Sequence, residues 1–488
     1  MLEGKGRGVI ATRDMAPGDV VLATAPLAFV ASPHRQRPSG ELVVDQILDR
    51  RLYGSKWFSV LYDGSARSSK AQFGLAPGTA PEPSPSGDST GVGADAPRSA
   101  QPPEPVLAST SAPSAGAKGG AGGGATAAAA TPKKKGFLAS RAAARRSKGA
   151  APAGDVAAAV DSAEGRAAAQ TLPLPDRREQ TRLAKIVKFN CFGDDAEDLA
   201  AAACRGEEPR GHIGLWPEFA LLNHSCAPNA VNFVVGDAMV VRACRPIRAG
   251  EEVTISYLGR PQLLPFRKRI SILSEDYGFE CTCQRCVIIG NVDLTVCRMP
   301  AAPPGCLLPC GPQAEEAHYD KVEDVYGELA EAVEERLGPA FLEARDKGDT
   351  EAIAELQREV QSWLRRLYGL FRKTLLAPDV RHYVVASMYD AYDLALSCAT
   401  ALGQGEDASS LQACLKAMEL VSGGSDLHVI LAVRHHDATV QAHGEGSPLA
   451  RLAREALRRA HVARYGPVSE ALMERLVRLN RELHVQDG

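Results

Sequence analysis

The pattern of apolar and polar positions divides the chain into two kinds of region. Strand-like runs, rich in β-branched residues and bounded by turn residues, occur near the N-terminus and again before residue 260. They are GVIATRDMAPGDVVLATAP (8–26), NAVNFVVGDAMVVRACRPI (229–247) and EEVTISYLG (251–259). The first of these predicts two strands around a Pro-Gly turn.

Beyond about residue 313 the apolar positions recur every three or four residues instead, which predicts amphipathic helices. The clearest segments are 319–338, 350–375, 381–402 and 449–466. Stacked helix pairs of the tetratricopeptide type explain such a series, although the repeat signature is loose. The sequence therefore predicts a mixed fold, with a β-rich part followed by an all-α helical-repeat domain.

Between these two parts of the pattern, one long segment lacks apolar periodicity. From Asp63 to Lys188 the only aromatic residues are Phe73 and Phe137, and tracts such as GGAGGGATAAAA dominate. Such a segment buries too little apolar surface to offset its ordering entropy. We expect a low-complexity, mostly disordered insert at 33–180, with a short helix in its first thirty residues.

Composition excludes several classes of protein. The 488 residues carry a formal net charge of −3, so nothing indicates a specific nucleic-acid partner. No apolar run is long enough for a transmembrane helix, and we expect no membrane association. The apolar segment 20–32 resembles a secretion signal, but Asp14, Pro17 and Asp19 interrupt its approach, and we expect no secretion.

The cysteines are the first sign of specific chemistry. None precedes Cys191, and Cys281, Cys283 and Cys286 fall in the short segment CTCQRC. This spacing indicates a metal site in a reducing compartment, and a tetrahedral zinc site needs a fourth ligand, for which Cys226 is the leading candidate. The alternative is a set of unrelated buried thiols. The looser cysteines at 297, 306 and 310 offer a second zinc site, but unrelated thiols are the favoured interpretation there.

A polar cluster lies inside apolar sequence in FALLNHSCAPN (219–229). Asn223 and His224 need partners if they are buried, and these partners are protein groups, a ligand or a metal. The glycine turn GKGRG (4–8) precedes this cluster in the chain, and the strand ending in Tyr257 follows it. Each feature alone is weak, since a Gly-rich turn is usually only a turn and a strand tyrosine usually packs.

Taken together, GKGRG, LLNHSCAPN, GEEVTISY and YGFECTCQRC resemble the SET domain of protein-lysine methyltransferases with its post-SET zinc loop. The likeness is greatest for the SET-and-MYND subgroup, whose SET core is also split and whose chain also ends in a tetratricopeptide-like domain. One departure is clear: the subgroup's MYND zinc finger is absent, because residues 33–180 hold no cysteine and only His34.

The resemblance implies a domain order and a fold. It places the SET domain at 1–32 and 181–260 around the insert, the post-SET zinc loop at 261–290 and the helical domain at 313–485. The expected SET fold has small sheets and a knot-like C-terminal crossing. The implied activity is methyl transfer from S-adenosylmethionine to a neutral lysine in a narrow channel, with one structural zinc ion.

The resemblance also implies roles for individual residues. Tyr257 is the catalytic tyrosine and Tyr277 lines the lysine channel. The residues implied to contact S-adenosylmethionine are Lys5, Arg7, Asn190, Asn223, His224, Tyr257 and Phe279, and the zinc ligands are Cys226, Cys281, Cys283 and Cys286. Glu251 and Glu252 are candidate general acids, but structural hydrogen bonds in a turn are the favoured interpretation.

Two other functions compete with a histone or non-histone lysine methyltransferase. One is a catalytically weak SET scaffold that recruits a protein partner through its helical domain, and intact Asn223, His224 and Tyr257 argue against it. The other is a plastid-type enzyme, against which CTCQRC argues. The basic segment 133–148 resembles a bipartite nuclear-import signal, with a solvated basic patch as the alternative, so we expect the nucleus, the cytoplasm or both.

Overall fold

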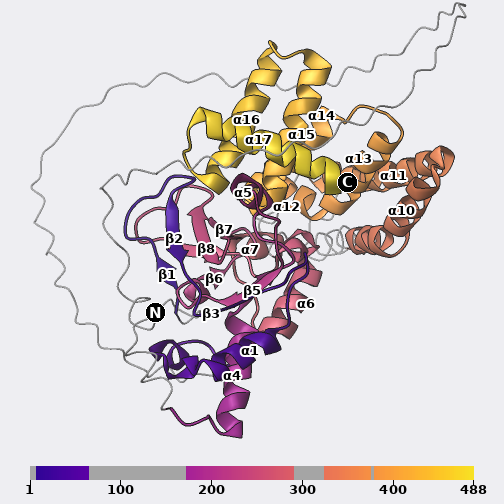
Figure 1. The fold of residues 1–488 in the computed structure, drawn as a ribbon. Helices are drawn as coiled ribbons and strands as arrows, with labels where there is room; N and C mark the ends of the chain where they lie inside the picture. The colour runs from indigo at the N-terminus through magenta and orange to yellow at the C-terminus, as the bar shows by residue number, and fades with distance from the viewer. Residues whose placement is uncertain (1–6, 65–171, 291–323, 375–377, 488) are drawn as a thin grey trace, which may run out of the picture. The chain divides into compact units, whose positions relative to one another are not determined.

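The computed structural model describes residues 7–64, 172–290, 324–374 and 378–487, which all belong to one compact unit. Strands occupy the part before residue 260 and helices fill the part after 324 (Figure 1). This arrangement confirms the expected mixed fold. Most of the expected insert, the basic segment 133–148 and the cysteines at 297, 306 and 310 lie outside the described residues.

Nine short strands form three small sheets within the described residues. Each sheet joins one strand from the N-terminal region to two strands that lie beyond residue 190. In sheet order they are β1 (Val9–Ile10), β9 (Glu252–Ile255) and β6 (Asn223–His224); β2 (Val20–Thr24), β8 (Ala238–Ala243) and β7 (Ala230–Val235); and β3 (Ala28–Ala31), β5 (His212–Leu215) and β4 (Phe192–Asp194). Most pairs are antiparallel, whereas β6 runs parallel to β9.

The two predicted N-terminal strands exist, but they do not pair with each other. β1 pairs with β9, and β2 pairs with β8. The Pro-Gly turn between them approaches another part of the chain instead: Gly18 has φ +90°, and a Cβ there would lie 2.5 Å from the carbonyl oxygen of Val462. Glycine is needed here because a side chain would collide with main chain that cannot move aside.

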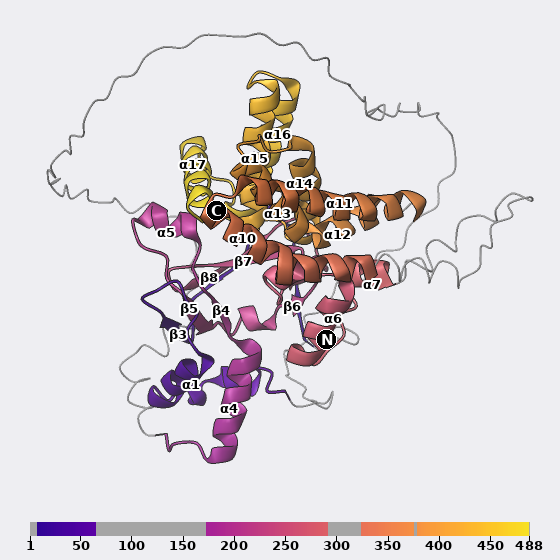
Figure 2. The ribbon, with the colours of Figure 1, turned by 90° about the vertical axis from the view of Figure 1, so that its right-hand side faces the viewer.

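The folded region extends into the expected low-complexity insert from both sides. Helix α1 (Gly40–Asp49), capped by Ser39, packs against α4 (Arg177–Asn190), capped by Asp176, and the two views show them side by side (Figures 1 and 2). The helices bury apolar residues at three- and four-residue spacing, namely Val43, Ile47, Leu183, Ile186 and Val187. Helix α1 is the short helix expected early in the 33–180 segment, and residues 33–64 and 172–180 both belong to this folded region.

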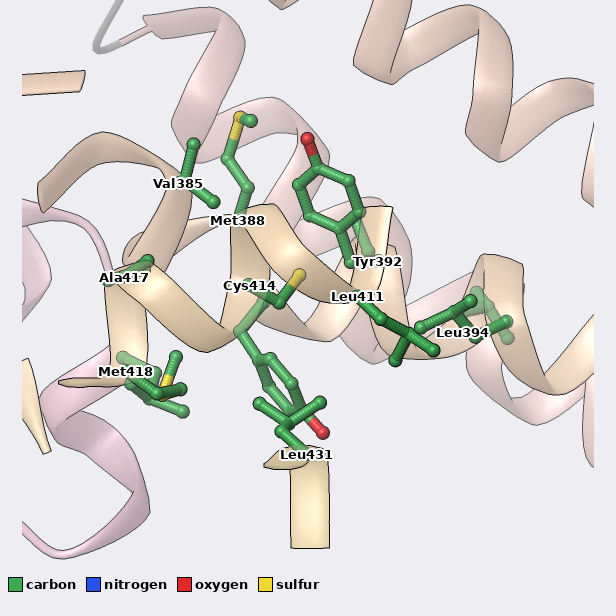
Figure 3. Packing of buried hydrophobic residues seen from close by; sticks show 14 of the residues in the cluster. Val385, Met388, Tyr392, Leu394, Leu411, Cys414, Ala417, Met418 and Leu431 are labelled. Atoms are coloured by element: carbon green, nitrogen blue, oxygen red, sulfur yellow. The ribbon is translucent and has the colours of Figure 1, made fainter. Parts of the chain in front are cut away.

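The second half of the described chain is helical. Its elements are the π-helix η5 (Val333–Leu337), α10 (Gly338–Lys347), α11 (Thr350–Thr374), α12 (Pro378–Ser387), α13 (Tyr389–Ala401), α14 (Ala408–Val421), α15 (Asp426–His443), α16 (Pro448–Tyr465) and α17 (Glu470–Asp487). Val385, Tyr392, Leu411 and Leu431, which come from α12, α13, α14 and α15, belong to one buried hydrophobic cluster (Figure 3).

One predicted helix differs from the structure, and one helix of the structure was not predicted. The segment 381–402 is two helices rather than one, because the chain breaks at Met388, which has φ −95° and ψ 8°. Helix α15 lacks an apolar stripe because it is buried on several sides. Almost no surface is exposed, 0–2% of each side chain, at Val429, Leu431, Ala432 and Val433. A helix that is buried on several sides shows no amphipathic period.

The strand-rich and helical parts share buried contacts. Ala227, Leu263 and Ile289 belong to the same hydrophobic cluster as the core of α13 to α15. A buried ion pair adds to this contact: Arg464 Nε of α16 lies 2.7 Å from Asp198 Oδ2, the residue that caps α5 (Leu199–Arg205).

We expect Asp198→Asn to lower the free energy of unfolding by about 3–5 kcal/mol, because it removes the carboxylate that pairs with the buried charge of Arg464. Asparagine caps helices as well as aspartate does, so α5 keeps its cap. The matched control is Asp437→Asn, which breaks the exposed pair with Arg481 and should cost under about 1 kcal/mol. Chemical denaturation of both variants checks this, and similar costs for the two would contradict it.

Candidate active site

Three segments of the predicted site meet at the sheet β1-β9-β6. Asn223 lies on β6, and its side-chain Nδ2 donates to the carbonyl oxygen of Arg7 at 2.8 Å and to Oε1 of Glu252 at 2.7 Å. The sheet register places Val9 beside Val253 and Asn223 beside Thr254. The amide of Asn223 thus ties the main chain at Arg7 to the strand that leads to Tyr257.

Tyr257 is the centre of an aromatic cluster at the end of β9. Its ring centroid lies 5.4 Å from those of His224 and Tyr277 and 6.4 Å from that of Phe279. The hydroxyl of Tyr257 donates to the carbonyl oxygen of Leu222 at 2.5 Å, and the hydroxyl of Tyr277 donates to the carbonyl oxygen of Tyr257 at 3.0 Å. The structure therefore brings together the predicted catalytic tyrosine, the predicted channel residue and Phe279.

The environment of these phenols keeps them protonated. Burial raises the pKa of Tyr257 well above its ordinary value, and the nearby Tyr277 and Glu252 raise it further. Burial also raises the pKa of Tyr277. Both hydroxyls are consequently hydrogen-bond donors at neutral pH rather than bases.

His224 is 6% exposed, and protein groups occupy both nitrogens of its ring. Nδ1 accepts a hydrogen bond from the main-chain N–H of Tyr257 at 3.0 Å, and Nε2 lies 3.3 Å from Sγ of Cys226. Because Nδ1 accepts, the neutral ring carries its proton on Nε2 and donates it toward the sulfur. This imidazole links the sulfur cluster to the main chain of Tyr257.

The four predicted zinc ligands are gathered in one place. The Sγ atoms of Cys226, Cys281, Cys283 and Cys286 all lie within 4.8 Å of one another, and all four residues are buried. Cys226 Sγ is 3.5 Å from Cys286 Sγ and 4.0 Å from Cys281 Sγ. A tetrahedron of sulfurs about 2.3 Å from zinc has edges of about 3.8 Å, so the donor set fits a structural zinc ion.

The cluster also favours thiolate over thiol at one position. Hydrogen bonds from Cys281, and after it from Cys283 and Cys286, hold the pKa of Cys226 far below its ordinary value, and His224 adds to the effect. A thiolate is the form that binds metal.

Other predicted residues have different surroundings. Glu251 accepts from Asn229 and from the main chain of Arg248, and Glu252 accepts from Asn223, so structural hydrogen bonds are confirmed for this pair. Asn190 ends α4 and donates both amide hydrogens to carbonyl oxygens, those of Tyr62 and Ile186, each at 2.7 Å. Its predicted contact with a cofactor is not supported by these bonds, which hold α4 to the end of the 33–64 segment. Lys5 lies outside the described residues.

Asn229 lies in the same motif as Asn223 and His224, but the sequence indicated no role for it. This buried amide donates to Oε1 of Glu251 and to the carbonyl oxygen of Glu252, and its Oδ1 accepts from the main chain of Thr254. It thereby fixes the strand that precedes Tyr257. An Asn after Pro in a polar motif was the available signal.

No helix among the described residues combines the length and the apolar character that crossing a membrane requires.

The fold and the site together define the class of protein. Residues 6–258 match the family model of the SET domain, and the chain belongs to the SET-domain family.

Its similarity to individual proteins is confined to short stretches. The chain is 43% identical over 83 residues to histone-lysine N-methyltransferase SMYD3 of Mus musculus, which is 17% of this chain and 19% of that protein. It is 37% identical over 117 residues to N-lysine methyltransferase SMYD2-A of Danio rerio, 24% of each chain. A SET and MYND domain-containing protein of Dictyostelium discoideum is 35% identical over 107 residues, 22% of this chain and 30% of that protein. The matches thus span less than a third of each relative.

Proposed function

We propose that the protein is an S-adenosylmethionine-dependent protein-lysine N-methyltransferase. The observation that carries the proposal is the position of Tyr257, whose protonated hydroxyl lies inside a half-buried aromatic cluster beside the meeting point of Arg7 and Asn223. Family membership and the printed activities of the similar proteins support the same conclusion.

The residues around this meeting point suit the proposed methyl donor. Arg7 is exposed, and its guanidinium is a suitable partner for the carboxylate of an amino-acid moiety. Phe279 is half-buried and offers a ring face to a purine. When bound, S-adenosylmethionine supplies an electrophilic methyl group on a sulfonium.

The aromatic cluster has two tasks in the proposed reaction. A free lysine amine has a pKa of about 10.4 and is mostly charged at neutral pH. Rings such as those of Tyr257, Tyr277 and Phe279 exclude water and lower that pKa, so that the amine is deprotonated without a dedicated base. The cluster also holds the amine in line with the carbon that it attacks, and positioning of this kind supplies much of a displacement's rate.

Tyr257 orients rather than ionises in this mechanism. Its hydroxyl is directed by the Leu222 carbonyl, and its main chain is held by His224 and Tyr277. The post-SET loop contributes Tyr277 and Phe279, and the sulfur cluster fixes that loop to Cys226. We propose a protein or peptide lysine as substrate, a nuclear or cytoplasmic location and a protein partner for the helical domain.

A calorimetric titration of the purified zinc-loaded protein with S-adenosylmethionine tests the proposal. We expect saturable binding that Asn223→Ala weakens, because the amide then no longer holds the turn containing Arg7. Absence of binding to the unmodified protein would leave the scaffold function as the better explanation.

A pH profile gives a second expected result. Single-turnover methyl transfer should rise with pH as the substrate amine loses its proton. No falling limb should appear between about pH 7 and about pH 10, because the raised pKa of Tyr257 keeps its proton in place over that range. A decline with a midpoint near pH 10, the ordinary pKa of a phenol, would contradict the raised pKa of Tyr257. Circular dichroism over the same range controls for unfolding.

A further inference from the structure

Two arginines beside the sulfur cluster are almost completely buried. Arg269, on α6 (Phe266–Tyr277), is 1% exposed, and Arg285, on α7 (Gln284–Gly290), is 0% exposed. Neither forms an ion pair with a carboxylate in the part of the chain that the structure describes. A buried cation is costly unless an opposite charge compensates it.

The groups around Arg285 come from three separate segments. Its Nη1 donates to the carbonyl oxygens of Cys226 at 3.0 Å and Gln262 at 2.9 Å. Its Nη2 donates to Oγ of Ser387, the last residue of α12, at 2.8 Å, and the guanidinium lies 5.9 Å from the ring centroid of Tyr383 on the same helix. One side chain thus joins a zinc-ligand loop to the helical region.

Arg269 interacts with the sulfurs themselves. Its Nη1 donates to the carbonyl oxygen of Leu264 at 2.6 Å, whereas Nε and Nη2 are buried without a conventional hydrogen-bond partner. Its neighbours on α6, Ile270 and Leu273, pack in the same buried cluster as the four cysteines. The guanidinium of Arg269 contacts the sulfurs of Cys226 and Cys286, and so lies beside two zinc ligands.

Charge balance explains why both arginines are tolerated. Four thiolates around one divalent ion carry a net charge of minus two, and two guanidiniums carry plus two. The charged arginines and the metal centre therefore neutralise each other inside the core. Four neutral thiols would leave two buried cations without any compensating charge.

We propose that Arg269 and Arg285 are the counter-ions of the metal–thiolate centre, and that Arg285 makes the docking of α12 dependent on metal occupancy. The two arginines act on the site through the cysteines, so they are positioning residues. The shared core of Ile289, Leu263 and Ala227 with the helices supports a tight coupling at this contact. Removal of the metal should then loosen α12 as well as the zinc loop.

The first test measures zinc release in the full-length, zinc-loaded protein with a chromogenic chelator. We expect Arg285→Met to accelerate release about 10- to 100-fold, the size of effect typical when a group that supports metal ligands is lost. Hydrogen exchange should rise in α12 of the same variant. Arg285→Lys keeps the charge but not the fork of donors, so we expect it to retain zinc better than Arg285→Met while α12 still loosens.

Arg260→Met is the matched control. Arg260 also joins the strand-rich part to a helix, because its Nη2 donates to Asp390 Oδ1 at 2.8 Å and its guanidinium lies 5.9 Å from the ring of Tyr389. Its side chain is 65% exposed and contacts no zinc ligand among the described contacts. Zinc release should stay at the unmodified rate in this variant, and equal acceleration in both methionine variants would overturn the proposal.

A second test needs no substitution and remains decisive if Arg285→Met does not fold. Zinc is removed from the unmodified protein by chelation, and hydrogen exchange is compared between α12 and α16. We expect exchange to increase several-fold more in α12 than in α16. Unchanged exchange in α12, or an equal increase in both helices, would overturn the coupling. Neither test measures methyl transfer, so the inference and the proposed function can fail independently.

Discussion

Cys283→Ser should release the zinc ion and abolish methyl transfer. Serine is a poor zinc ligand, and three remaining sulfurs leave the tetrahedral site open. Structural zinc sites contribute about 10–16 kcal/mol to the folding of small zinc domains, so the post-SET loop should lose its order. Tyr277 and Phe279 would then leave the aromatic cluster. Metal analysis should show zinc falling from about one ion per chain to near zero, with activity reduced at least about a hundredfold.

The matched control is Cys244→Ser. Cys244 is half-buried, and its Sγ lies 3.6 Å from the carbonyl oxygen of Pro228 rather than within the sulfur cluster. This variant should keep its zinc and its activity. Unchanged zinc content in Cys283→Ser would show that the ligand set is assigned wrongly.

Tyr257→Phe has the second large expected effect. The change removes only the hydroxyl that the Leu222 carbonyl orients, and the ring still packs against His224 and Tyr277. We expect kcat to fall about a hundredfold, because a small loss of alignment at the reacting atoms has that consequence. Affinity for S-adenosylmethionine should change little. Kinetics and a binding titration on the same preparation measure the two quantities.

Tyr326→Phe provides the comparison for this variant. Tyr326 is 4% exposed, and its hydroxyl donates to the carbonyl oxygen of Val384, so the same bond is lost in the helical region. Its activity should remain near that of the unmodified protein. Parallel losses of turnover and cofactor affinity in Tyr257→Phe would assign Tyr257 to binding rather than to the chemical step.

Local chemistry was predictable from the sequence wherever it depends on spacing. Three cysteines within six residues lie close together in any fold, and three thiols at this spacing indicate a metal site. The fourth ligand, Cys226, is 55 residues away from Cys281. It was the leading candidate because the cysteines at 297, 306 and 310 have looser spacing, and the family resemblance implied the same residue. The structure places its sulfur 4.0 Å from that of Cys281.

The pairing of distant strands was not predictable, because the alternation of apolar and polar residues in a strand does not identify the strand with which it pairs. Val9 pairs with Val253 rather than with the next strand in the chain. The hydrogen-bond partners of polar side chains are equally hard to predict from sequence. The imidazole of His224 connects Cys226 to Tyr257. The amide of Asn190 donates to the carbonyl oxygens of Tyr62 and Ile186.

The composition of the chain did not predict the folded residues next to the insert, because the short helices there depend on partners far along the chain. Val43 and Ile47 are buried in a cluster to which α4 contributes Leu183 and Ile186. Each segment alone is too short to be a stable helix, since helices of this length take their stability from packing. Composition taken over one helix at a time therefore underestimates how many residues are folded on either side of the insert.

Mass spectrometry of lysine-containing peptides, incubated with the zinc-loaded protein and isotopically labelled S-adenosylmethionine, addresses the proposed activity most directly. The predicted result is a labelled methyl group on a lysine side chain, strongly reduced by Tyr257→Phe and absent with Cys283→Ser. A protein that binds the cofactor but labels no lysine, in a broad peptide panel or in a cell extract, would contradict the assignment as a methyltransferase.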